Sequence, residues 1–171
     1  MLAHKILPST LALLVSASVA HAQQDDLRPG IAVMALQNGG SYGQTVEDIS
    51  ALSVGLQQML LVELQVNSAL RIVERSQLRE ILDELGLVRD SLVNAQTAAR
   101  IGMLLGARYM VLGSFTVLFE DFHLNARVVD VETSEVIVTK RVHDKDEKIY
   151  QLVVELAGQL TDAVDLPPLP E

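Results

Sequence analysis

The spacing of apolar residues along the chain changes between the period of a strand and that of a helix. Residues 31–36 form a short, wholly apolar run before a glycine-rich stretch, which is typical of a buried strand. Apolar residues then recur every three or four positions, the spacing of a helix with one buried face. This spacing predicts four helices. The first spans 46–65, with Gln57 off its apolar face; the second is capped by Ser76 and ended by Gly86; the third is capped by Asn94 and ended by Gly106; and the fourth is capped by Asp146.

The remaining apolar segments follow the two-residue period of strands. A short one lies at 70–74, and three longer ones span 108–119, 122–131 and 135–143. Links of two or three residues join the longer ones, so they predict an antiparallel meander. The element order is therefore β-α-β-α-α-β-β-β-α. It predicts an α/β (α+β) fold, in which a mixed sheet with a C-terminal antiparallel β-meander carries the helices packed on it.

The first 22 residues differ from all that follows and predict export. Lys5 precedes an apolar run over 6–19, and small residues end it at 20–22, which is the pattern of a cleavable secretory signal. The alternative is an uncleaved anchor, but the run is shorter than the roughly 20 residues that span a bilayer. We expect a signal peptide at 1–22, a polar lead-in at 23–29, one α/β domain over 30–164 and a proline-rich tail at 165–171.

Composition narrows the compartment and the partners. The chain has no cysteine, so it has no disulfide, no thiolate metal site and no cysteine nucleophile. It also lacks the cysteine to which a bacterial lipoprotein attaches its lipid. These features favour the Gram-negative periplasm, with no membrane span in the mature chain. The net charge of −9 argues against nucleic acid as a partner.

The polar residues provide no convincing catalytic or metal site. His123 and His143 are the histidines outside the predicted signal, and we place them in opposite registers of the meander, where neither has further ligands or a nucleophile. Two pairs of adjacent acids, at 83–84 and 120–121, read as solvated surface. Asp146 reads as a helix cap. The sequence therefore predicts that the protein is not an enzyme and that it has no catalytic, cofactor-binding or metal site.

Residues 37–45 (QNGGSYGQT) predict a glycine-rich loop between the first strand and the first helix. Phosphate-binding loops lie at such a position, but these glycines do not give the GxGxxG spacing and no lysine or arginine accompanies them. A surface loop is the favoured interpretation. If it contacts a partner, the contact residues would be Asn38, Gly39, Gly40, Ser41, Tyr42 and Gly43.

Three segments in order resemble the CsgG (curli production assembly/transport) family and its relatives with a TolB-like periplasmic fold, such as the penicillin-binding-protein activator LpoB. They are residues 71–86 (RIVERSQL running on to ILDELG), residues 98–114 (AARIG to LGARYMVLGS) and residues 126–136 (ARVVDVETSEV). The resemblance covers roughly 28–164. The residues that match the family motifs, for which it implies a structural role, are Glu74, Arg75, Gly106, Gly113, Asp130 and Thr133.

The resemblance also shows where this chain departs from the family. Ser134 stands where the family usually has glycine. If the turn needs a left-handed backbone, serine costs about 1–2 kcal/mol there, which favours a turn different from that of the family. In curli transporters, inserted hairpins build a membrane barrel and the loop after the first strand narrows the pore. Here the links between strands leave no room for such hairpins between Ser114 and Thr139. The channel is therefore not expected, although the matching loop at 37–45 remains.

The resemblance implies a periplasmic domain that recruits or assembles other proteins. We expect a non-enzymatic scaffold or accessory in outer-membrane or surface-structure assembly or secretion, whose partners are cell-envelope proteins or further copies of itself. The alternative is an LpoB-like binding module that activates a peptidoglycan synthase.

Overall fold

The computed structural model describes residues 26–43, 48–87 and 93–164. The expected signal peptide at 1–22 and the expected tail at 165–171 lie outside the described residues, as do residues 23–25 of the lead-in. Within the described ranges the elements are β1 (Gly30–Val33), β2 (Gln37–Tyr42), α1 (Leu52–Gln65), β3 (Arg71–Ile72), α2 (Arg75–Glu84), α3 (Ala95–Leu104), β4 (Tyr109–Leu118), β5 (Asp121–Asp130), β6 (Val136–Lys145), a 3₁₀ turn (Asp146–Lys148) and α4 (Ile149–Ala163).

The six strands of the described residues form one mixed sheet in the order β3-β1-β4-β5-β6, with β2 paired to β4 beside that path. Strands β4, β5 and β6 are antiparallel, so the predicted meander is confirmed. Strand β4 is long enough to hold two short parallel partners in line. Its first half pairs with β1 and its second half with β2. The predicted α+β fold class is therefore confirmed.

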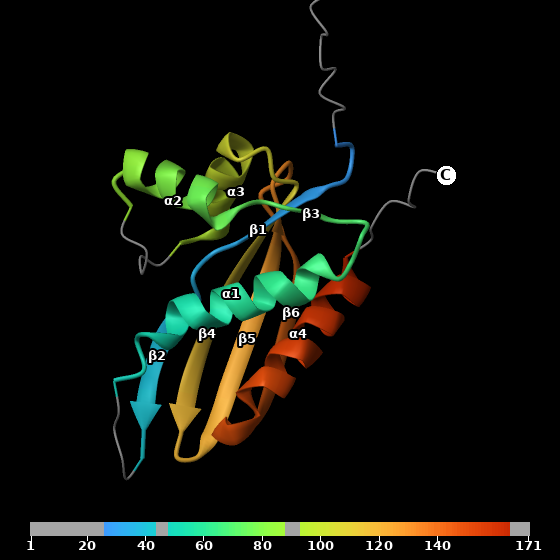
Figure 1. Ribbon diagram of the computed structural model, residues 1–171. Helices are drawn as coiled ribbons and strands as arrows, with labels where there is room; N and C mark the ends of the chain where they lie inside the picture. The colour runs from blue at the N-terminus through green and yellow to red at the C-terminus, as the bar shows by residue number, and fades with distance from the viewer. Residues whose placement is uncertain (1–25, 44–47, 88–92, 165–171) are drawn as a thin grey trace, which may run out of the picture.

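Helices pack on both faces of the sheet, but they cover the two faces unequally. Helices α1 and α4 lie along the length of one face, where Phe115 and Phe122 stack within a core that includes Leu56 and Leu156. Helices α2 and α3 gather at the end of the sheet that carries β1 and β3 (Figure 1). Their core on the second face is smaller and includes Met110 and other residues nearby in the sheet.

The helix ends follow local signals in part. The Oδ1 atom of Asn94 accepts a hydrogen bond of 2.8 Å from the backbone N–H of Thr97, which confirms Asn94 as the cap of α3. Gly86 and Gly106 follow α2 and α3 with φ angles of 63° and 60°, as predicted for the glycines that end these helices.

Two other predicted caps were wrong. Helix α2 begins at Arg75, so Ser76 lies inside its first turn and Glu74 takes the capping position without a side-chain bond. Asp146 opens the 3₁₀ turn that precedes α4, and it does not cap that helix. Helix α1 begins only at Leu52, although its predicted start at 46 lies outside the described residues. These starts are set by the turns that join the helices to the sheet.

Segment 37–45 was predicted to be a loop, and this was wrong over 37–42, which form strand β2; residues 44 and 45 lie outside the described residues. The second half of β4 needs a backbone partner on the side where β1 ends, and β2 supplies it. A Cβ atom on Gly39 would lie 3.0 Å from the carbonyl oxygen of Phe115, so the glycine permits a close approach of the two strands. The pairing shifts register between Asn38 and Ser41.

Gln57 was expected on the polar side of α1, but its side chain is buried, with 3% of its surface exposed. Its Nε2 atom donates a hydrogen bond of 2.6 Å to the carbonyl oxygen of Val33, at the end of β1. A buried carbonyl group needs a donor, which explains a glutamine in the apolar face of α1.

The residues that match the family motifs lie at turns and close contacts. The Oδ1 atom of Asp130 accepts hydrogen bonds from the backbone N–H groups of Glu132 (2.9 Å) and Thr133 (3.0 Å), and its Oδ2 atom accepts one from Arg108 (2.7 Å). The hydroxyl of Thr133 accepts a bond of 3.3 Å from the N–H of Glu135. Glu74 and Arg75 begin α2 and Gly106 follows α3. Gly113 packs in β4 beneath Leu36.

Ser134 adopts the left-handed conformation that would favour glycine, with a φ angle of 60°, so serine does not change the conformation of this turn. Because this conformation strains any residue with a Cβ atom, we predict that Ser134→Gly raises the free energy of unfolding by about 0.5–1 kcal/mol. Urea denaturation measures the change. Ser134→Ala retains the Cβ atom and is the control, for which no gain is expected. Equal stability of the glycine and alanine variants would contradict the prediction.

Candidate partner-binding site

The C-terminal end of β2 meets the β4–β5 hairpin at the end of the sheet opposite α2 and α3 (Figure 1). The backbone N–H of Phe119, in the hairpin turn, donates a hydrogen bond of 2.6 Å to the carbonyl oxygen of Tyr42. The predicted contact residues at 38–43 therefore lie along the edge of β4, and the last of them adjoin the hairpin. Gly43 packs directly against Phe119.

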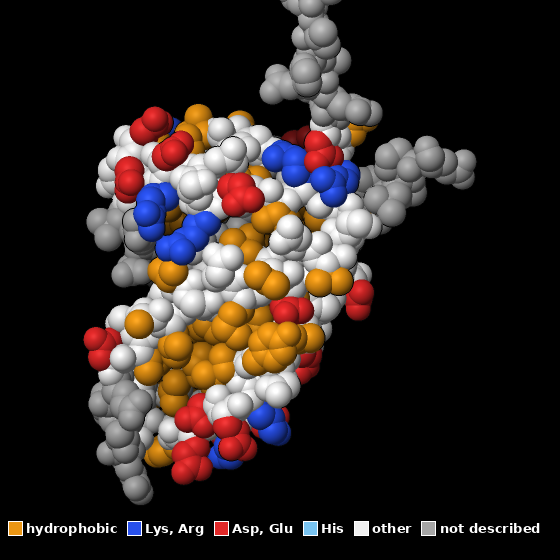
Figure 2. All heavy atoms as spheres, viewed as in Figure 1, with side chains coloured by type: hydrophobic (Ala, Val, Ile, Leu, Met, Phe, Trp, Pro, Cys, Tyr) orange, Lys and Arg blue, Asp and Glu red, His pale blue; other side chains and the backbone are white. Residues whose placement is uncertain are grey.

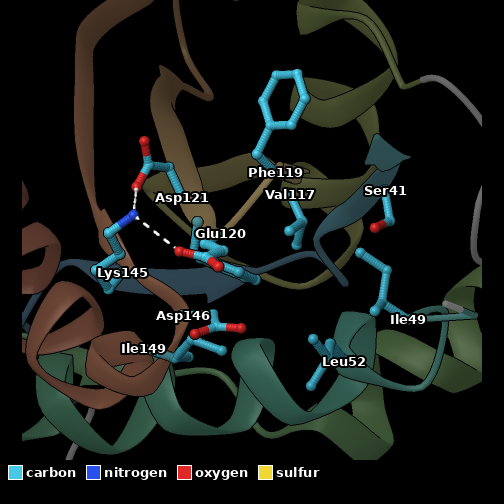
Figure 3. A pocket seen from close by; sticks show the side chains of 11 residues that line it. Ser41, Ile49, Leu52, Val117, Phe119, Glu120, Asp121, Lys145, Asp146 and Ile149 are labelled. Atoms are coloured by element: carbon cyan, nitrogen blue, oxygen red, sulfur yellow. Dashed lines mark ion pairs between the residues drawn. The ribbon is translucent and has the colours of Figure 1, made fainter. Parts of the chain in front are cut away.

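A pocket of about 590 Å³ opens at this end of the molecule (Figure 3). Its lining comes from β2, the start of α1, the hairpin, the end of β6 and the start of α4. The apolar side chains that line it are Ile49, Leu52, Val117, Phe119, Phe122 and Ile149. The space-filling view shows apolar side chains gathered on this part of the surface, with acidic and lysine side chains along its lower border (Figure 2).

The charged residues of the pocket are mostly acidic. The ammonium group of Lys145 lies 2.9 Å from a carboxylate oxygen of Asp121 and 3.5 Å from one of Glu120. The hydrogen bond with Asp121 raises the pKa of Lys145 above its usual value. Asp146 also lines the pocket and has no ion pair with any other described residue. The pocket thus holds three carboxylates and one ammonium group, so the charge around it is negative.

Phe119 is the most unusual residue of this end. Its side chain is 78% exposed, and the ring points away from the other apolar side chains of the pocket (Figure 3). Its φ angle is 61°, at the first central position of a two-residue hairpin turn, where glycine is favoured. Tyr42, 57% exposed, follows on the neighbouring strand. A bulky apolar residue that is both exposed and strained is a feature of binding surfaces.

Sequence reasoning missed Phe119, which it treated as the end of a strand. The only signal in the sequence was the short link between the two strands. A link of this length allows only a two-residue turn, and the aromatic Phe119 lies in it. Such a turn requires a positive φ at its first central residue or at both.

The histidines were placed in opposite registers, and this was wrong. His123 and His143 are direct cross-strand partners in β5 and β6, and their rings stack with centroids 5.2 Å apart. The register depends on the turn at 131–135, whose length and bonding the spacing of apolar residues did not reveal. In the part of the chain that the structure describes, no group of three or more histidine and acidic residues could hold a metal ion.

Comparison with known proteins identifies the family. The family model of the curli production assembly/transport component CsgG matches residues 12–121, well over half of the chain. The chain belongs to the CsgG family. This match takes in the first two of the three segments that resembled the family, and the third, at 126–136, lies beyond it. Among curated protein sequences, none matches this CsgG-family chain significantly.

Solved structures show where else the fold occurs. The C-terminal domain of LpoB from Escherichia coli superposes with a TM-score of 0.55 at 22% identity, over 70% of this chain and 84% of that one. TolB from Acinetobacter baumannii gives a TM-score of 0.54 at 15% identity, over 82% of this chain but only 29% of TolB. The CsgG-family chain therefore shares the LpoB and TolB-like fold. No helix within its described residues is long and apolar enough to cross a membrane.

Proposed function

We propose that this CsgG-family chain is a non-enzymatic accessory domain of the Gram-negative cell envelope that works by binding other envelope proteins. The signal peptide at 1–22 directs its export to the periplasm and is then removed. There the domain serves as a scaffold or accessory in outer-membrane or surface-structure assembly or secretion. Membership of the family supports the compartment and the type of role.

Phe119 is the observation that carries the proposal. Its position strains the backbone by about 1–2 kcal/mol, because a residue with a Cβ atom takes a left-handed conformation. Its ring is mostly in water, so packing within the chain does not offset that strain. A partner that buries the ring would offset the strain. Aromatic residues beside a pocket are typical anchors of protein interfaces, and the acidic residues around this pocket favour a partner with basic residues at its contact surface.

In-cell photo-crosslinking tests this function. A photoreactive amino acid at position 119 is expected to capture a cell-envelope protein, whereas the same amino acid at position 66 is not. Val66 is a matched control, because it is 81% exposed and follows the far end of α1. Equal capture from both positions, or capture from neither, would contradict the proposal.

Phe119→Gly separates binding from folding. Glycine removes the backbone strain, so we predict that the free energy of unfolding rises by about 1 kcal/mol. Loss of the aromatic anchor is expected to reduce recovery of the captured partner at least about tenfold, as for a residue at the centre of an interface. Co-purification and urea denaturation of the same variant measure the two effects. Val66→Gly should leave recovery unchanged.

The LpoB-like fold favours one more specific role, an activator of a peptidoglycan synthase. This alternative predicts that the purified protein accelerates glycan synthesis by such an enzyme. An unchanged rate would remove the alternative, and the broader proposal would still depend on the crosslinking result.

A further inference from the structure

Part of the second sheet face is not covered by any of the described helices. Leu112 and Val129 pack into the core beneath α2 and α3. Side chains alternate along a strand, so Ser114 and Thr116 lie on the same face as Leu112, further along β4. Among the described elements, only α3 makes substantial contact with β4 and β5 on this face, and it lies at the other end of the sheet (Figure 1).

We call this uncovered surface the open face. Its side chains come from three cross-strand rows of β4, β5 and β6. Leu112 of β4 pairs with Arg127 and Thr139, and it marks the border with the α2/α3 core. The next row consists of Ser114, Asn125 and Arg141, and the one after it of Thr116, His123 and His143.

The open face differs in charge from the molecule as a whole. The chain has a net charge of −9, yet these three rows contain two arginines, two histidines and no acidic residue. Among the described residues of β5, the next carboxylate on this face is that of Asp121, two residues before His123, and it pairs with Lys145. Three rows of described residues with two arginines and no carboxylate, on an acidic protein, are complementary to a negatively charged partner.

The side chains are also available for binding. Arg127 donates one hydrogen bond of 3.0 Å, to the carbonyl oxygen of Val93, and keeps its other donors. The exposed guanidinium group of Arg141 has no hydrogen bond or ion pair with any described residue. His123 and His143 contact each other through their rings, which leaves their nitrogen atoms open to a ligand.

We propose that the open face binds an extended acidic segment of a partner protein, with Arg141 as its principal contact. The surface is a flat sheet, so it would not enclose a small anion. Its residues Thr139, Arg141 and His143 recur every second position along β6, a repeat of about 6.6–6.8 Å. An extended peptide with acidic residues at alternate positions has the same repeat, so successive carboxylates meet Arg141 and His143. This surface is separate from the pocket beside Phe119.

Fluorescence anisotropy with a labelled ten-residue peptide of alternating glutamate and serine tests the proposal on the mature chain in about 50 mM salt. The wild type should bind this peptide, and should not bind the peptide in which lysine replaces each glutamate. Arg141→Glu is expected to weaken binding at least about tenfold, since it places a carboxylate opposite a carboxylate. His143→Glu should weaken it in the same direction. Arg141 and His143 are exposed, so both variants should keep the wild-type thermal unfolding temperature.

Arg100→Glu is the matched control. It makes the same charge change at an exposed position of α3, away from the open face, and should change the affinity less than about twofold. The proposal is overturned if the wild type does not bind the acidic peptide, or if Arg100→Glu weakens binding as much as Arg141→Glu. It is also overturned if the chain binds polygalacturonate, an anionic polysaccharide, through Arg141 but does not bind the peptide. Peptide binding to the open face does not depend on crosslinking at position 119, so the two proposals can fail separately.

Discussion

Replacing Gly113 with alanine is expected to lower the free energy of unfolding by about 3 kcal/mol. A Cβ atom at this position would lie 2.7 Å from the carbonyl oxygen of Asn125 and 3.1 Å from the side chain of Leu36. The first neighbour is backbone of the adjacent strand, so it cannot move without disturbing the β4–β5 pairing. Overpacking of this kind usually costs about 1–3 kcal/mol, and a clash with backbone belongs at the upper end of that range.

Urea denaturation of the Gly113→Ala variant measures this loss. Gly55→Ala is the matched control, because the same methyl group there meets nothing within 4 Å and lies on the exposed side of α1. Alanine favours a helix over glycine, so the control should gain up to about 1 kcal/mol. A loss of less than about 1 kcal/mol at position 113 would show that Leu36 and β5 adjust easily, contrary to the prediction.

Asp130→Ala is expected to cost about 2–4 kcal/mol. Asp130 is 6% exposed, and its carboxylate accepts three hydrogen bonds, two from the turn that joins β5 to β6 and one from Arg108. Alanine leaves these donors unpaired and removes the partner of a partly buried guanidinium group. Arg108 also pairs with the exposed Glu132, which limits the loss.

Asp130→Asn separates the turn from the ion pair. The amide oxygen can still accept from Glu132 and Thr133, while the amide nitrogen faces Arg108, so about half of the loss is expected. Asp83→Ala makes the same change at an exposed position of α2 and should change stability by less than about 0.5 kcal/mol. Chemical denaturation of the three variants gives the comparison. Similar stabilities for Asp130→Ala and Asp83→Ala would refute the structural role of this carboxylate.

Local chemistry explains the parts of the fold that sequence reasoning predicted. Asn94 caps α3 through a bond to a residue three positions away, and the glycines after α2 and α3 adopt conformations that their own lack of a Cβ atom favours. The meander follows from short links and from the two-residue period of its strands. Each of these features depends on residues close together in the chain.

Strand β2 shows where this reasoning failed. Its glycines were interpreted as signs of a loop, because glycine weakens an isolated strand. Here Gly39 allows β2 to approach β4, which lies about seventy residues further along the chain. The need for a glycine therefore arises from a long-range contact. Gln57 was misplaced for the same reason, since its bonding partner is the end of β1.

The candidate site was predicted only in part. The segment at 38–43 was selected, but the pocket beside it combines residues from seven separate elements, from β2 to α4. Phe119 could not be selected, because its strain and exposure follow from the turn that the two paired strands impose. The stacking of His123 on His143 depends on the register of β5 and β6. A shift of one residue would place the two side chains on opposite faces of the sheet.

The amino-acid sequence alone was enough to predict the CsgG-family resemblance, the α+β class and the antiparallel meander, and to exclude cysteine chemistry. These follow from residue types, periods and turns, which act over a few neighbouring positions. Tertiary structure decided that β2 is a strand, that a pocket forms beside Phe119, and that the helices leave the face around Arg141 uncovered. Such features arise where distant segments compete for the same strand edge or sheet face, and the outcome depends on the packing of the whole chain.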